Sequence, residues 1–199
     1  MTEGLHTIAT MVHLMGTAIG IGSATVSDVL FFRFLRDYRI SREEQRVLST
    51  LHPLFWTALG ILVLSGIVLI AADPTRYLAS SKLQLKLIVV GVIILNGIFL
   101  NFVVSPRLRR ISFGGAHLGH HPGELHHLRH AAFASGAISL TSWYIALVLG
   151  SLRSIPLSLT TGLLTYVGVL AAAVAGSQLM ERYIRRRQRR GDTNTTLRR

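Results

Sequence analysis

Five apolar segments, each about as long as a bilayer is thick, limit what this chain can fold into. A helix needs roughly 20 apolar residues to cross the hydrocarbon core of a bilayer. Only helices and closed barrels satisfy their backbone hydrogen bonds in lipid. The sequence therefore predicts an all-α integral membrane protein with one transmembrane domain, residues 1–180, and a basic tail, residues 181–199. The five predicted transmembrane helices cover residues 5–32, 47–72, 83–105, 131–151 and 155–180.

The composition agrees with a membrane location. Half of the residues are hydrophobic and 15% are charged, whereas a soluble domain carries about 25% charged residues. The net charge of +12 could suggest nucleic acid, but the basic residues lie between and after the apolar segments. We therefore expect the lipid bilayer, and no nucleic acid, as a partner. The chain has no cysteine, which excludes thiolate ligands and disulfides.

The basic residues also predict the orientation, because cytoplasmic connectors are enriched in Lys and Arg. The first connector, the third connector and the tail carry seventeen basic residues, against three in the other two connectors. We expect the N-terminus outside, the C-terminus in the cytoplasm and a bacterial inner membrane. The tail is expected to be disordered beyond Gly191. The alternative is a four-helix chain in which residues 131–151, which include Ser135, Ser139 and Ser142, are re-entrant.

The first apolar segment carries its small and polar residues on one helical face. At 100° per residue, this face holds His6, Ala9, His13, Gly16, Thr17, Gly20, Ser23, Ala24, Ser27 and Asp28, and the opposite face holds Ile8, Met11, Met15, Val26 and Phe31. One interpretation is close helix packing through Gly16 and Gly20. The other is that these glycines leave room for haem below His13, since imidazole is a common axial ligand of haem iron.

Lys86, in the third apolar segment, is a second candidate, because an ionisable side chain in lipid is costly. Its helical face also holds Lys82, Ile93, Gly97 and Asn101. Lys86 either snorkels to the nearby outer surface or points inward to a carboxylate such as a haem propionate. His13 and Lys86 reach a similar depth in the outer part of the membrane, so both can belong to one site.

Two further histidines mark the cytoplasmic side. His52 precedes Pro53, and proline is typical of a first helical turn, while His130 begins the fourth segment. Their equal depth makes them candidates for a second cofactor site; the alternative is a position at the lipid head groups. The two histidines per helix of four-helix dihaem cytochromes are absent, because the partner positions are Ser27 and Trp143.

The third connector is rich in histidine. It contains His117, His120, His121, Glu124, His126, His127 and His130. In a helix, Glu124 with His127 and His126 with His130 would share faces. Imidazole and carboxylate ligands suit Zn, Ni, Cu(II) or Fe, so the connector is a candidate site for a divalent transition metal. The alternative is a solvated loop that its glycines make mobile.

Short motifs in the first half of the chain resemble a known family. The sequence His13-Leu-Met-Gly16, followed by small residues and then by residues 31–35 (Phe-Phe-Arg-Phe-Leu), is similar to the first helix of HemJ-type protoporphyrinogen oxidases and of the copper-resistance CopD group. Residues 56–66 and 81–90 resemble the second and third helices of HemJ. The resemblance covers residues 5–105 and implies a b-type haem ligand at His13 and a residue important to the same site at Lys86.

These observations lead to one hypothesis and two alternatives. We expect a haem-b-binding inner-membrane redox protein with an unidentified electron donor or acceptor; as an enzyme it would be a haem-dependent oxidoreductase. The first alternative is a metal transport or resistance protein that uses residues 117–130. The second is a non-catalytic subunit whose small-residue faces dock a partner or a second copy of the chain. No hydrolase or phosphate-loop motif is present.

Overall fold

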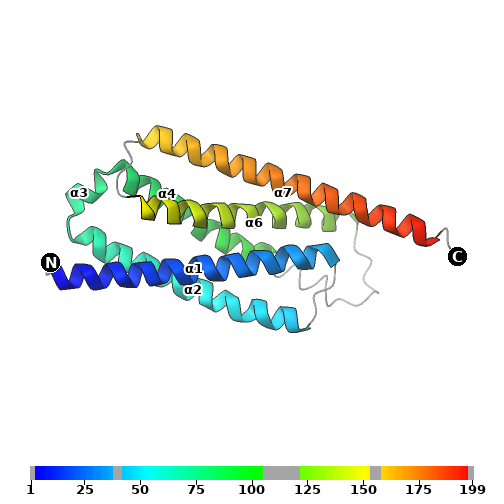
Figure 1. Cartoon of the computed structure of the whole chain (residues 1–199), viewed down its shortest axis with the longest axis horizontal. Helices are drawn as coiled ribbons and strands as arrows, with labels where there is room; N and C mark the ends of the chain where they lie inside the picture. The colour runs from blue at the N-terminus through cyan, green and yellow to red at the C-terminus, as the bar shows by residue number, and fades with distance from the viewer. Residues whose placement is uncertain (1–2, 38–41, 105–121, 153–157, 197–199) are drawn as a thin grey trace.

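The computed structural model describes residues 3–37, 42–104, 122–152 and 158–196, which form only helices and turns (Figure 1). In chain order the helices are α1 (Glu3–Asp37), α2 (Arg42–Ala71), α3 (Pro74–Leu78), α4 (Ser81–Phe99), the π-helix η1 (Leu100–Val104), α6 (Pro122–Ser151) and α7 (Leu159–Thr196). Five stretches are long and apolar enough to cross a membrane: Glu3–Leu30, Ser49–Ala71, Ser81–Val104, His130–Ser151 and Leu159–Tyr183. Each overlaps one of the five expected segments, so the prediction of five apolar helices is confirmed.

Helix α6 is the central helix of the bundle. It packs against α1, α4 and α7, while α1 packs most extensively against α2. Half of the apolar stretch of α6 is buried, against 11% of that of α7, which lies at the edge of the bundle in Figure 1. The start of α1 and the short α3 lie at one end, here named the N-terminal end, and the last turns of α7 lie at the opposite, C-terminal end.

Buried serines of α6 connect it to all three of its neighbours. Because lipid cannot pair with polar groups, such side chains turn inward to partners on other helices. The three pairs are Ser135 with Asn96 of α4, Ser139 with Asp28 of α1 and Ser142 with Tyr166 of α7. The re-entrant alternative for residues 131–151 was wrong, because α6 is a continuous helix and its serines pair with neighbouring helices.

The face of α1 that sequence periodicity marked as small and polar is the buried face. Ala9, Gly16, Gly20, Ser23, Ala24 and Asp28 are buried, whereas Ile8, Met11, Met15 and Val26 are exposed. Small residues allow the α1 backbone to approach α2 and α6 closely. His6 is the exception, because it is exposed near the start of the helix.

Two expectations about helix ends were wrong. Pro53 does not occupy a first turn, because α2 already begins at Arg42 and continues through the proline. The helix loses one backbone hydrogen bond there, since proline has no N–H. The basic tail is not irregular beyond Gly191, because α7 continues to Thr196. The arginines and the glutamine that precede Gly191 are good helix formers, which favours a helix up to that residue.

Candidate functional site

His13 lies between α1 and α2, where two hydrogen bonds in series orient its imidazole. His13 Nδ1 is 3.0 Å from Ser65 Oγ, and the Ser65 hydroxyl donates to the Ile61 carbonyl at 2.6 Å. Because the serine hydrogen is used in the bond to Ile61, the serine oxygen accepts and Nδ1–H of His13 donates. In a neutral imidazole that makes this bond, the hydrogen is on Nδ1 and the lone pair is on Nε2.

Gly66 forms part of the surface beside this ring. A Cβ atom at position 66 would lie 3.5 Å from Cε1 and 3.8 Å from Nδ1 of His13. The imidazole therefore lies directly over the backbone of α2 next to Ser65. His13 itself is only partly buried. The N-terminal half of α1 thus has one histidine whose orientation α2 fixes from two adjacent positions.

Lys86 supplies a positive charge to this site from α4. Its side chain is partly buried, and its charge acts on the His13 imidazole. The neighbouring Lys82 has a different role, because its Nζ donates to the Leu152 carbonyl after the end of α6. The structure therefore brings His13 and Lys86, which the sequence analysis assigned to one site, within electrostatic range of each other.

The two glycines expected to leave room below His13 are both covered by other helices. A Cβ on Gly16 would lie 3.0–3.3 Å from Ile61, Leu62 and Ala58 of α2, two of these atoms being backbone. These contacts leave no room for a cofactor at Gly16.

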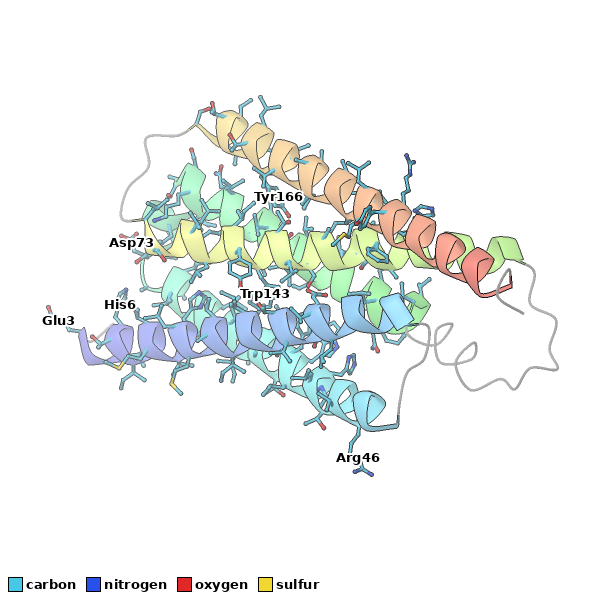
Figure 2. The ribbon with its side chains drawn as sticks, turned by 45° about the vertical axis from the view of Figure 1, so that its right-hand side comes forward. Glu3, His6, Arg46, Asp73, Trp143 and Tyr166 are labelled. Atoms are coloured by element: carbon cyan, nitrogen blue, oxygen red, sulfur yellow. The ribbon has the colours of Figure 1, made fainter. Side chains whose placement is uncertain are left out.

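The surface of Gly20 is covered by α6 and not by α2. A Cβ on this residue would lie 2.3 Å from the Trp143 ring, and Figure 2 shows that Trp143 points from α6 toward α1. The expectation of open space at Gly16 and Gly20 was therefore wrong. Both glycines serve close helix packing, which was the other interpretation of the sequence.

The two histidines proposed for a second site have different neighbours. His52 is exposed, and its ring centroid is 6.4 Å from that of Trp56 one turn along α2. His130 interacts with α7, where its Nδ1 hydrogen-bonds Gln178 and its Nε2 is 3.8 Å from a carboxylate oxygen of the fully buried Glu181. The Gln178 amide also donates to the His130 carbonyl at 3.0 Å. His130 therefore joins α6 to α7.

Most of the proposed metal ligands cannot be placed. His117, His120 and His121 lie outside the described residues, as do the side chains of Glu124, His126 and His127. Among the side chains that the structure does describe, no three His, Asp or Glu residues are grouped as metal ligands. The histidine-rich connector therefore stays a prediction from the sequence.

The sequence analysis missed several residues that the structure gives a role. Ser65 orients His13, Ser139 pairs with Asp28, and Glu181 lies beside His130. A serine in an apolar helix gives no direct sign of its partner, because the partner comes from a helix distant in the sequence. The buried carboxylates gave a clearer signal, since they lie within or at the end of apolar stretches.

Comparison of the chain with protein-family models, with curated proteins and with solved structures finds no match.

Proposed function

We propose that this protein is a multi-pass membrane protein that binds b-type haem at the His13 site and functions in electron transfer or oxidation. The observation that carries the proposal is the hydrogen bond between His13 Nδ1 and Ser65 Oγ at 3.0 Å. A histidine that ligates a metal through one ring nitrogen normally donates its other N–H to a fixed acceptor. Ser65 is such an acceptor, and the Nε2 lone pair is left for iron. Bound haem would supply the redox chemistry.

The surroundings of His13 decide where such a group would bind. The packing of α2 against Gly16 and of Trp143 against Gly20 closes the surface of α1 below His13. The side of the imidazole toward Lys86 of α4 is the alternative, and α1 and α4 are not among the helix pairs that pack extensively. The ammonium of Lys86 would neutralise a propionate there, since a buried charge needs a partner.

The charge distribution supports the orientation that goes with this site. The start of α2 and the last turns of α7 lie at the C-terminal end of the bundle. Most of the arginines of the sequence lie in and near these two segments. By the positive-inside rule, this end faces the cytoplasm of a bacterial cell, and His13 lies in the outer half of the bilayer. The resemblance of residues 5–105 to the HemJ and CopD groups is consistent with this arrangement.

The visible absorption spectrum of the protein, purified in detergent from haem-replete cells, tests the proposal. Wild type and the matched control His6→Ala are expected to show a Soret band, because His6 is exposed on the same helix. His13→Ala is expected to lose it while it keeps its helical circular dichroism. Colourless wild-type protein, or a Soret band that persists unchanged in folded His13→Ala, would refute haem ligation by His13.

The variant Ser65→Ala tests the role of the hydrogen bond separately. It removes the acceptor for Nδ1–H, so His13 is expected to bind iron more weakly, by about 10-fold to 100-fold, as for other removed partners of metal-binding histidines. Titration of the apoprotein with haem measures this change. An affinity equal to that of wild type would show that Ser65 does not position the ligand.

A further inference from the structure

Asp28 is a buried carboxyl group that the haem site does not use. It lies in the first apolar stretch, Glu3–Leu30, on the face of α1 that packs against α6. Its side chain is 6% exposed, and its Oδ2 atom has no hydrogen-bond partner among the described residues. An ionised carboxylate in such a place is costly unless a positive charge or several donors compensate it.

The groups that face Asp28 do not provide such compensation. Ser139 of α6 supplies a side-chain hydrogen bond, and burial and this bond define the environment of the carboxyl group. Three described side chains of α2 and α6 near the C-terminal end of the bundle are charged or titratable: Arg46, His52 and His130. Arg46 and His52 are exposed, and His130 interacts with α7. Among the described residues, the hydroxyl group of Ser139 is therefore the polar group that reaches the Asp28 carboxyl from another helix.

A bound metal cation does not fit these surroundings. Calcium takes six to eight oxygen ligands, and magnesium requires a nearly complete octahedron. The described surroundings of Asp28 supply its own carboxyl oxygens and the hydroxyl of Ser139. A proton needs no coordination shell, and its binding removes the charge that burial makes costly. The chemistry of the site therefore selects a proton.

We propose that Asp28 is a proton-binding site and that its side chain is the neutral acid. It lies in the seam between α1 and α6, which is the contact surface of these two helices around Asp28 and Ser139. Burial holds the proton in place, because an ionised carboxylate would have lost its water and would have one hydroxyl group as its described polar neighbour. A rearrangement that admits water to this seam would lower the cost of the charge and release the proton. The bundle thus has a group that couples the packing of α1 against α6 to the uptake of one proton. This proposal does not depend on haem binding.

Glu181 provides a matched comparison within the same chain. It is also fully buried, but one of its carboxylate oxygens is 3.8 Å from Nε2 of His130. Asp28 has the hydroxyl group of Ser139 in place of this imidazole. The two residues therefore differ in their described polar neighbours and hardly in their exposure.

Reaction with dicyclohexylcarbodiimide tests whether Asp28 is protonated, because the reagent is apolar and adds to protonated carboxyl groups. The purified full-length protein in detergent is treated at neutral pH, and the modified peptides are identified by mass spectrometry. We expect the adduct on the peptide that contains Asp28, its loss in Asp28→Asn and its retention in Glu181→Gln. Folded wild type that shows no labelling at Asp28 would overturn the proposal.

Infrared spectroscopy tests the same point without a reagent that has to enter the seam. The difference spectrum between wild type and Asp28→Asn at neutral pH is expected to contain the carbonyl stretch of a carboxylic acid. This band should disappear from wild type as the pH is raised, since the acid then ionises. A difference spectrum that contains only carboxylate bands at neutral pH would show that Asp28 is ionised and would overturn the proposal.

Discussion

Replacement of Gly20 by alanine would force one extra methyl group into the closest contact between α1 and α6. The new Cβ would lie 2.3 Å from Cη2 and 2.6 Å from Cζ3 of Trp143. The indole has little room to move, because it is 1% exposed and its ring centroid is 5.9 Å from that of Phe55. Relief therefore requires α1 and α6 to separate, or the Trp143 side chain to leave its position.

The size of the effect follows from two opposing contributions. Extra methyl groups in a packed core typically cost about 1–3 kcal/mol. Alanine in place of glycine within a helix gains up to about 1 kcal/mol. For Gly20→Ala we therefore expect a net loss of about 0–2 kcal/mol in unfolding free energy. Gly22→Ala is the matched control, because no heavy atom lies within 4 Å of its Cβ position, and it should gain up to about 1 kcal/mol.

Unfolding in SDS from mild-detergent micelles, followed by circular dichroism, measures both variants. The informative quantity is the difference between them, expected to be about 1–3 kcal/mol in favour of Gly22→Ala, because the gain in helix propensity is common to both. Tryptophan fluorescence should also change in Gly20→Ala, since Trp143 is one of two tryptophans in the chain. Equal stability of the two variants, with an unchanged spectrum, would refute the packing of Trp143 on Gly20.

Two further predictions concern the hydrogen bonds of α6. Asn96→Ala removes the hydrogen bonds at 3.0 Å and 2.6 Å to Ser135. Because interhelical hydrogen bonds average about 0.6 kcal/mol each and reach about 1.7 kcal/mol, this variant should lose about 1–2 kcal/mol of unfolding free energy in the same SDS assay. Stability within error of wild type would contradict this prediction. Tyr166→Phe removes a bond at 2.9 Å to Ser142 and should cost about 0.6 kcal/mol. A double-mutant cycle with Ser142→Ala should recover this value, and no coupling would mean that the bond is absent in solution.

The number of long apolar helices and the buried face of α1 could be predicted from the sequence. Apolar length depends on residues adjacent in the chain, and a period of 3.6 residues makes each helical face readable from spacing alone. For the same reason, the exposure of Met11 and Met15 and the burial of Ala9 and Ala24 agree with the periodicity. The charged residues that merit attention, Asp28 and Lys86, also stand out in apolar segments without any knowledge of their neighbours.

The use of each buried face was decided only by the tertiary structure. The sequence offered two interpretations of the glycines in α1, and the choice depended on whether α2 and the Trp143 ring cover them. The hydrogen-bonded state of His13 likewise depends on Ser65, fifty-two positions along the chain. Hydropathy and periodicity are properties of one segment, whereas a packed surface or an oriented imidazole is a property of two segments. The physical cause is that packing and hydrogen bonding act over a few ångströms in space, irrespective of separation along the chain.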